Sequence, residues 1–236
     1  MSIDTTCRIH ATETMDDFSL EGRDLREALD KIASINRFLG GNNVTVKGVE
    51  ILIADIPANK EITVVDIGCG NGDMLRTLAN YALKTNRKFK LIGVDANQFT
   101  ANYARALSQA FPNIRVECLD VFAPEFAELD YDIALCTLTL HHFEESRIFQ
   151  LLDVLKNRAR TGIVINDLDR SRLAYRLFQV LAFVCGLNKM SREDGLVSIL
   201  RGFKKNELAQ FSRKMAFKNV LIKWKWAFRY QWIIRL

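Results

Sequence analysis

Hydrophobic positions in residues 60–170 follow two alternating patterns. Short, almost continuous apolar runs stand at 62–67, 90–94, 114–119, 131–136 and 162–165. Between them, apolar residues recur every three or four positions, which is the helical period and predicts helices at 74–85, 100–110 and 144–157. Strands that alternate with helices of this length predict βαβ units and a parallel sheet.

The N-terminal part has only the helical pattern. Leu25, Leu29, Ile32, Ile35 and Leu39 recur at spacings of three and four, which predicts a helix over 21–38 that ends at Gly40-Gly41-Asn42-Asn43. A second helix is expected over 44–56 and should stop before Pro57, since the residue before a proline avoids the α region.

The pattern changes after residue 170. Residues 171–186 predict a helix that is apolar on more than one face, and residues 204–214 predict a charged amphipathic helix. Residues 219–236 predict two strands with a turn near Ala227-Phe228, so a hairpin should add an antiparallel strand to the parallel sheet.

Composition indicates one globular domain. The 236 residues are 49% hydrophobic and 26% charged, and no linker-like segment interrupts them. The net charge of +5 is uneven, because residues 170–236 carry +12 and the rest −7. A basic C-terminal quarter could contact nucleic acid, an anionic membrane or an anionic substrate, or be a solvated face, and the composition leaves these readings open.

Several features favour a cytoplasmic location. The five cysteines are scattered without a C-x-x-C pair, which predicts neither a disulfide framework nor a zinc site. The first residues have no apolar segment of the kind a signal peptide needs. The longest uncharged stretch, Leu177–Asn188, has twelve residues, whereas a spanning helix needs about 18–20.

A glycine-rich turn follows the first strand of the alternating region. Asp66-Ile67-Gly68-Cys69-Gly70-Asn71-Gly72-Asp73 lets the backbone turn sharply beneath a ligand. A dinucleotide-binding turn needs a third small residue where Asp73 stands. Two carboxylates, Asp66 and Asp73, should also repel a pyrophosphate. The turn therefore favours a ligand with a positive charge and no phosphate.

The turn resembles the D/E-x-G-x-G-x-G signature of class I S-adenosylmethionine-dependent methyltransferases, and three further landmarks agree. Leu91-Ile92-Gly93-Val94-Asp95 ends a strand in an acidic residue, Val116–Val121 contains Asp120, and Tyr131–Thr137 leads into Leu138–Phe143. The similarity covers residues 60–170 with all landmarks in order.

The resemblance implies a fold, a cofactor and a set of binding residues. The fold is α/β: a Rossmann-like doubly wound sheet, mostly parallel with an antiparallel C-terminal strand, with N-terminal helices and a helical insertion after strand five. We expect one domain with an N-terminal helical lid (1–57), a cofactor-binding core (58–170), a helical insertion or lid (171–203) and a last helix with a hairpin (204–236). The cofactor is S-adenosylmethionine, the product is S-adenosylhomocysteine, and no metal is expected. Asp95 should hold the ribose, and Asp120 with Val121 should contact the adenine. The full cofactor-binding set is Asp66, Gly68, Gly70, Asn71, Asp73, Asp95, Ala96, Asp120, Val121, Thr137 and Leu138.

Two adjacent histidines are the candidates for a base. A hydroxyl acceptor must lose a proton, and an unperturbed imidazole titrates near 6.5. His141 and His142 follow the fourth strand, where they could instead cap a helix or pack under the cofactor.

The substrate should be a small, lipophilic or aromatic molecule that bears a hydroxyl group. The apolar helix 171–186 is either extra core or a lid over a lipophilic pocket. Residues 165–175 are similar to methyltransferases of quinone, phenolic-lipid or aromatic polyketide pathways. The expected substrate contacts are Asn36, Arg37, Asn166, Asp167, Arg170 and Phe178.

Two other functions stay open. An RNA methyltransferase could use the basic quarter, but no N/D-P-P-Y/F segment follows strand four, so a nucleic-acid partner is not expected. A non-catalytic partner subunit could also use this fold. Peripheral membrane contact and the oligomeric state are left open.

Overall fold

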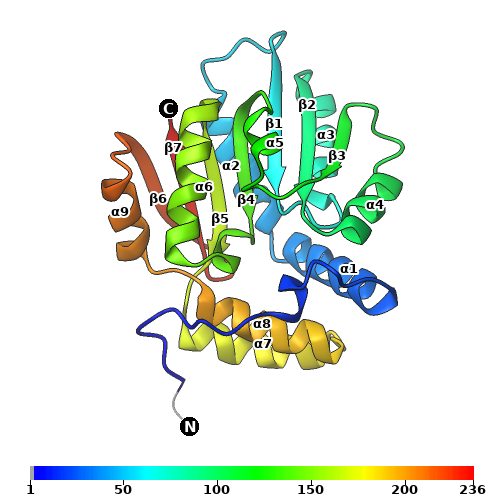
Figure 1. Cartoon of the computed structure of the whole chain (residues 1–236), viewed down its shortest axis with the longest axis vertical. Helices are drawn as coiled ribbons and strands as arrows, with labels where there is room; N and C mark the ends of the chain where they lie inside the picture. The colour runs from blue at the N-terminus through cyan, green and yellow to red at the C-terminus, as the bar shows by residue number, and fades with distance from the viewer. Residues whose placement is uncertain (1–2) are drawn as a thin grey trace.

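A single seven-stranded sheet organises the structure (Figure 1), a computed structural model that describes residues 3–236. The strand order is β3-β2-β1-β4-β5-β7-β6. Strands β1 to β5 pair in parallel, and β7 runs antiparallel to both β5 and β6. The strands are β1 (Glu61–Ile67), β2 (Lys88–Asp95), β3 (Ile114–Cys118), β4 (Tyr131–Thr137), β5 (Ala159–Leu168), β6 (Asn219–Lys225) and β7 (Arg229–Arg235). The predicted fold class, including the antiparallel C-terminal hairpin, is confirmed.

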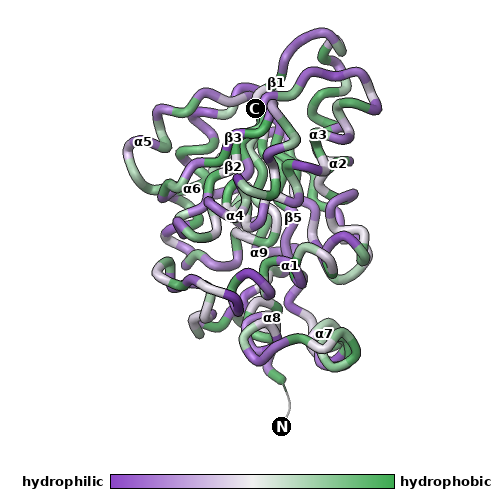
Figure 2. The backbone as a smooth tube through the Cα atoms, turned by 90° about the vertical axis from the view of Figure 1, so that its right-hand side faces the viewer, coloured by the Kyte–Doolittle hydropathy of each residue, from purple (hydrophilic) through white to green (hydrophobic). Residues whose placement is uncertain are grey.

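Helices cover both faces of the sheet. One face packs on α2 (Gly41–Leu52), α3 (Asp73–Thr85) and α4 (Gln98–Leu107), and the other on α5 (Pro124–Ala127), α6 (Glu145–Arg158) and α9 (Lys205–Lys214). Side chains alternate along each strand, so Ile62 and Val64 enter the first core, while Val65 and Ile67 enter the second. The hydropathy colouring of Figure 2 shows the apolar strands between these layers.

A third group of helices lies at the carboxyl ends of the strands. It consists of α1 (Arg23–Phe38), α7 (Arg172–Val184) and α8 (Lys189–Arg201), and α8 packs against both α1 and α7. The N-terminal segment, with the 3-10 turn η1 (Thr14–Asp16), runs along α8 towards α1 in Figure 1. A second 3-10 turn, η2 (Leu140–His142), follows β4 and contacts α8. These elements cover the edge of the sheet where α/β proteins bind ligands.

Some predicted boundaries are wrong, and each has a local cause. Gly40 adopts a left-handed conformation (φ 74°), which lets α2 begin at Gly41, three residues before the predicted start. Helix α2 also ends at Leu52, four residues early. Strand β5 extends far beyond the predicted 162–165 because it pairs with both β4 and β7.

The insertion after β5 differs from the prediction in two respects. Residues 171–203 form two helices, whereas only α7 was expected. Helix α7 buries only Ala174 and Ala182, and its other face exposes Leu173, Val180 and Phe183. The apolar helix is therefore not simply additional core.

Two findings bear on the possible contacts with a membrane or with nucleic acid. No helix within residues 3–236 combines the length and apolarity that crossing a bilayer requires. Three basic residues of the C-terminal quarter, Arg170, Arg201 and Arg229, are buried, so the outer surface there is less basic than the sequence suggests. The cytoplasmic location stays a prediction.

Candidate active site

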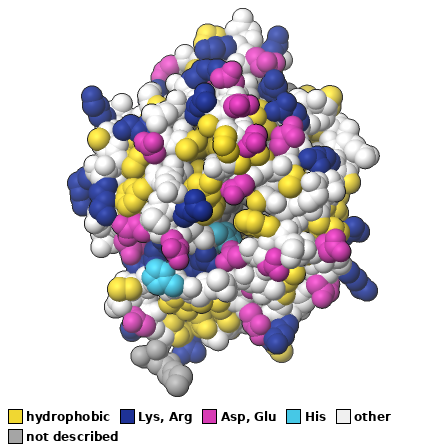
Figure 3. All heavy atoms as spheres, in the orientation of Figure 1, with side chains coloured by type: hydrophobic (Ala, Val, Ile, Leu, Met, Phe, Trp, Pro, Cys, Tyr) yellow, Lys and Arg dark blue, Asp and Glu magenta, His cyan; other side chains and the backbone are white. Residues whose placement is uncertain are grey.

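A cavity of about 790 Å³ lies at the carboxyl ends of β1, β2 and β4. This volume is within the range of small-molecule sites. The N-terminal segment, α1, η2, α8 and α9 contribute further walls. Figure 3 shows histidine, acidic and basic side chains gathered below the centre of the corresponding face. The predicted cofactor residues line this cavity, with the exception of Gly70: Asp66, Gly68, Asn71, Asp73, Asp95, Ala96, Asp120, Val121, Thr137 and Leu138.

The glycine-rich turn connects β1 to α3 through three left-handed residues. Gly68, Gly70 and Gly72 have φ values of 63°, 53° and 77°. A Cβ on Gly68 would stand 2.5 Å from Cγ2 of Thr139, so only glycine fits there. A Cβ on Gly70 would make only an ordinary contact, 3.5 Å from Cδ2 of Leu29, and the backbone N–H of Gly70 donates a hydrogen bond to Oδ2 of Asp95 at 3.0 Å. Gly70 thus holds the carboxylate of the next strand rather than forming the cavity wall.

Asp95 ends β2 with both carboxylate oxygens already held. Its Oδ1 accepts a hydrogen bond from the backbone N–H of Asn97 at 3.0 Å, while Oδ2 accepts the one from Gly70. Burial raises the pKa of Asp95 to about 6, although the two backbone hydrogen bonds oppose the shift. The carboxylate is therefore mostly ionised at pH 7 and keeps lone pairs for ligand hydroxyl groups.

The charge of Asp66 differs from the sequence-based expectation. Burial, with a further contribution from Asp95, raises the pKa of Asp66 to about 8, and its Oδ1 has no hydrogen-bond partner among the described residues. Asp66 is therefore mostly protonated at pH 7. Asp73 is ion-paired with Arg37 at 3.0 Å and accepts a hydrogen bond from Asn42 at 2.7 Å. The negative charge that these two residues present to the cavity is therefore smaller than the sequence suggests, and the repulsion of a pyrophosphate stays a prediction.

The remaining predicted cofactor residues border the same cavity from β3 and β4. Asp120 caps its own turn by accepting a hydrogen bond from the N–H of Phe122 at 2.9 Å. The hydroxyls of Thr137 and Thr45 are hydrogen-bonded at 3.0 Å. Leu138 has a left-handed conformation (φ 56°), and its N–H donates to the carbonyl of Asn166 at 2.9 Å. A branched side chain at positive φ is strained, a feature that often marks functional sites.

The two histidines are each bound to a different carboxylate. His141 Nδ1 is 2.6 Å from Oδ1 of Asp167, and His142 Nδ1 is 2.6 Å from Oδ1 of Asp16. His141 is buried, whereas the His142 side chain is 27% exposed, and both line the cavity. In both pairs the carboxylate occupies Nδ1, so Nε2 is the nitrogen left to accept a proton.

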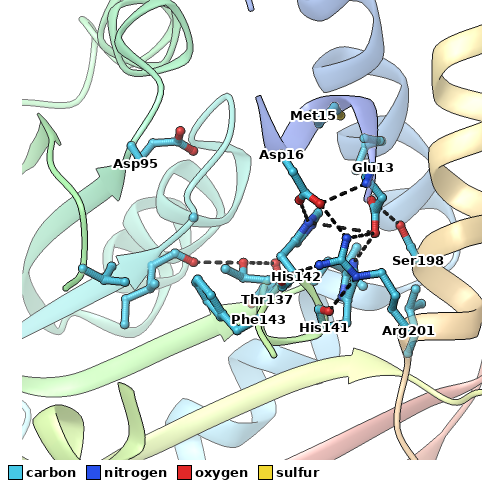
Figure 4. A pocket seen from close by; sticks show the side chains of 18 of the residues that line it. Glu13, Met15, Asp16, Asp95, Thr137, His141, His142, Phe143, Ser198 and Arg201 are labelled. Carbon is cyan, nitrogen blue, oxygen red and sulfur yellow. Dashed lines mark hydrogen bonds and ion pairs between the residues drawn. The ribbon is translucent and has the colours of Figure 1, made fainter. Parts of the chain in front are cut away.

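An ion-pair network joins His142 to the N-terminal segment and α8 (Figure 4). Arg201 Nη1 lies 2.6 Å from Oδ2 of Asp16 and 3.5 Å from Oε1 of Glu13. Ser198 donates to Oε2 of Glu13 at 2.7 Å. Burial pushes the pKa of Asp16 upwards, but the hydrogen bonds from His142 and Arg201 outweigh it and hold that pKa far below its usual value. Burial raises the pKa of Glu13. Asp95 lies on the other side of the cavity in Figure 4.

Glu13, Asp16, Ser198 and Arg201 were missed by the sequence reasoning. They come from two segments more than 180 residues apart, and no motif or period connects them. The spacing of Glu13 and Asp16 matches a reciprocal cap of one short 3-10 turn, which is a local signal without functional content.

Glu13, His141 and His142 offer three atoms within 4.8 Å of one another, which is close enough for a metal site. The geometry favours the ion-pair network instead. Glu13 Oε1 already faces the Arg201 guanidinium, and the His142 nitrogen nearest to it is the one bound to Asp16. A cation would meet a positive charge there. The absence of a metal stays a prediction.

The predicted substrate residues are not gathered in one place. Asn36 borders the cavity. Arg37 does not, because its exposed guanidinium forms the ion pair with Asp73. Asn166 and Asp167 are buried, the first donating to the Gly41 carbonyl and the second holding His141. Arg170 is fully buried in an ion pair with Glu207 at 2.7 Å. Phe178 lines a separate apolar cavity under α7. The structure therefore brings only Asn36 of this set to the cavity of the cofactor residues.

Comparisons with known proteins show which family and fold this chain resembles. The family described as "Methyltransferase domain" matches residues 64–162, which include the glycine-rich turn, Asp95 and both histidines. The strand order of this chain, with an antiparallel strand pair at the C-terminus, is that of the Rossmann-like methyltransferase fold. Residues 64–162 thus match the methyltransferase domain family, and the sheet has this fold.

The similar curated proteins are methyltransferases of different substrates. The chain is 28% identical over 119 residues to a ubiquinone biosynthesis O-methyltransferase of Rickettsia bellii, covering 50% of this chain and 46% of that protein. It is 26% identical over 164 residues to ribosomal RNA large subunit methyltransferase G of Shewanella denitrificans, covering 62% of this chain and 39% of that one. The chain thus spans less than half the length of these relatives.

Solved structures share the fold at low identity. The plantazolicin methyltransferase BpumL, crystallised with a monoazolic desmethyl-plantazolicin analogue and S-adenosylhomocysteine, has a TM-score of 0.65 at 15% identity, covering 88% of both chains. The magnesium protoporphyrin IX methyltransferase of Synechocystis PCC 6803, with bound S-adenosylhomocysteine, has a TM-score of 0.55 at 19% identity, covering 84% of both.

Proposed function

We propose that this chain is an S-adenosylmethionine-dependent methyltransferase that acts on a small, lipophilic or aromatic metabolite bearing a hydroxyl group. One observation carries the proposal. The glycine-rich turn, the Asp95 carboxylate and two carboxylate-bound histidines line the same cavity. A cofactor site and a candidate proton acceptor therefore border one space.

The residues present fit the cofactor. Asp95 has acceptor capacity for two ribose hydroxyls, and Asp120 with Val121 borders the adenine side that the resemblance implies. Asp66 is a buried carboxyl with an unpartnered oxygen, so a cationic ligand would gain from its ionisation. When bound, S-adenosylmethionine supplies a methyl group already activated by the positive sulfonium.

The chain's own contribution is to bind, to orient and to accept a proton. We assign the base to His142, because its side chain is partly exposed in the cavity and Asp16 fixes its Nδ1. Asp16 stays ionised, so it stabilises the imidazolium formed when Nε2 takes the acceptor's proton. His141 is a positioning residue, since it is buried between Asp167 and Glu13.

Transfer of a labelled methyl group from S-adenosylmethionine to a panel of phenols, hydroxyquinones and RNA tests the proposal. Labelling of a small hydroxyl compound that is lost in His142→Gln supports it. Labelling of RNA alone would favour the RNA methyltransferase. Cofactor binding without transfer to any acceptor would favour the non-catalytic role.

A further inference from the structure

A second cavity lies beyond the wall of the first. It has a volume of about 300 Å³, and Ile32, Asn36, Leu138 and Leu168 border both cavities. Its other walls come from the inward face of α7, from α8 and from the β6–β7 turn. The lining is almost entirely apolar, and it includes Leu177, Phe178, Leu181, Leu187 and Ile199. Figure 3 shows hydrophobic side chains gathered at the lower end of the molecule, where α7 and α8 lie.

Two cations line this largely apolar space: Lys31, whose ammonium donates to the Cys185 carbonyl at 3.3 Å, and the buried guanidinium of Arg229. Arg229, the first residue of β7, is 3% exposed, and its Nε and Nη1 have no hydrogen-bond partner among the described residues. Burial lowers the pKa of Arg229 to about 10, so the group remains charged at neutral pH. An uncompensated buried charge costs several kcal/mol and is rarely retained without a partner.

The charged and polar groups around Arg229 do not neutralise it. Asp167 is the acidic group whose charge acts on Arg229, but its oxygens are occupied by His141 and the N–H of Leu168. Asp169 also lines the cavity, but Lys204 and Trp224 hold its oxygens.

A neutral amide completes the polar corner of the cavity. Asn36 Oδ1 has no hydrogen-bond partner within residues 3–236, and both it and the Arg229 guanidinium lie where a Cβ on Gly41 would stand. The corner as a whole therefore lacks an anion.

Two residues of α8 also indicate that the second cavity is a preformed site. A Cβ on Gly195 of α8 would stand 2.3 Å from the ring of Phe178, so glycine allows the ring to lie between the two helices. Ser191, on the same helix, also lines the cavity, and its buried Oγ has no hydrogen-bond partner in the part of the chain that the structure describes.

We propose that the second cavity binds a single-chain lipophilic carboxylate, with its head group on Arg229 and its hydrocarbon chain between α7 and α8. A planar carboxylate can accept two hydrogen bonds from one guanidinium, which makes it the matching anion. The apolar walls fit an unbranched chain and offer too few donors for a phosphate. This inference does not depend on methyl transfer.

Calorimetric titration of the whole chain with octanoate, decanoate, 1-decanol and decylamine tests the inference. We expect decanoate to bind tightest and decylamine weakest. Each added methylene should tighten carboxylate binding about fourfold, the equivalent of ~0.8 kcal/mol. Trp226 borders the cavity, so its fluorescence gives an independent readout.

Two variants separate a ligand site from a structural role. Arg229→Met should weaken decanoate binding tenfold or more and leave 1-decanol unchanged, while the melting temperature holds or rises because a buried charge is removed. Arg235→Met, at the exposed far end of β7, is the matched control and should leave decanoate binding unchanged.

Failure of decanoate to bind, or equal binding to wild type and Arg229→Met, would overturn the inference. S-adenosylmethionine affinity is measured in the same variants. Because Arg229 does not line the first cavity, S-adenosylmethionine affinity should be unchanged in Arg229→Met. A wild-type chain that fails to bind S-adenosylmethionine would contradict the proposed function without affecting this inference.

Discussion

Asp95 accepts a hydrogen bond from the backbone N–H of Gly70, which links the end of β2 to the turn after β1. The two residues are 25 positions apart, and the parallel pairing of β1 with β2 places them together. The carboxylate is thereby fixed before any ligand arrives. Preorganisation of this kind reduces the cost of binding.

Asp95→Asn should weaken S-adenosylmethionine binding by about 1.5–3 kcal/mol, since two hydroxyls lose a charged acceptor. Calorimetry measures the effect. Thermal unfolding is measured in parallel, because an asparagine can accept from only one of the two backbone N–H groups that Asp95 holds, and affinities are compared at a temperature where both proteins are folded. An unchanged affinity would mean that Asp95 does not hold the ligand.

Cofactor affinity should fall below pH 6. The pKa of Asp95 is about 6, and ligand hydroxyls donate to its ionised form. Above pH 6 the Asp95 carboxylate is charged, so its contribution to cofactor affinity is constant. Below pH 6 protonation of Asp95 competes with ligand binding, and cofactor affinity drops by up to about tenfold per pH unit. Titrations between pH 5 and 8 measure this, and in Asp95→Asn the part of the decrease that lies below pH 6 should vanish, whereas the contribution of Asp66 near pH 8 should remain.

Binding of a cationic cofactor at pH 7 should release a proton from Asp66. Its pKa of about 8 leaves it mostly protonated in the free protein, and a nearby positive charge favours ionisation. Calorimetry in phosphate and in Tris, buffers with different ionisation enthalpies, measures the number of protons released. Asp66→Asn should release none, and equal heats in both buffers for the wild type would contradict the assignment.

His142→Gln should lower turnover roughly 10²–10⁴-fold with unchanged cofactor affinity. Asp16→Asn should have a smaller effect on turnover and should shift the pH–rate profile, because its carboxylate stabilises the imidazolium. His141→Gln is the control variant, because His141 also pairs with a carboxylate but is assigned a positioning role only. Equal losses in His141→Gln and His142→Gln would contradict the assignment of the base to His142.

Arg170→Met should destabilise the protein by about 1–3 kcal/mol, because the buried guanidinium donates to the partly buried Glu207 and to the carbonyls of Thr5, Thr6 and Gly202. Chemical denaturation measures this. The double variant with Glu207→Gln should recover part of the loss. A changed Michaelis constant at full stability would instead indicate that Arg170 contacts the substrate.

The sequence carried enough information for the core of the fold and the cofactor edge. Apolar runs, the glycine-rich turn and Asp95 are local signals, and parallel strands necessarily bring their carboxyl ends together. The network of Glu13, Asp16 and Arg201 could not be found in this way, because it depends on contacts between distant segments. Arg170 was expected to contact the substrate and Arg229 entered only the charge of the basic C-terminal quarter; both are buried, and burial of an arginine leaves no mark on the hydrophobic period.

Titration of the wild-type chain with S-adenosylmethionine, S-adenosylhomocysteine and NAD at pH 7.5 tests the central claim most directly. The proposed function predicts saturable one-to-one binding of the first two ligands, weakened in Asp95→Asn, and no binding of NAD. Saturable binding of NAD with no heat from either adenosyl compound would contradict it.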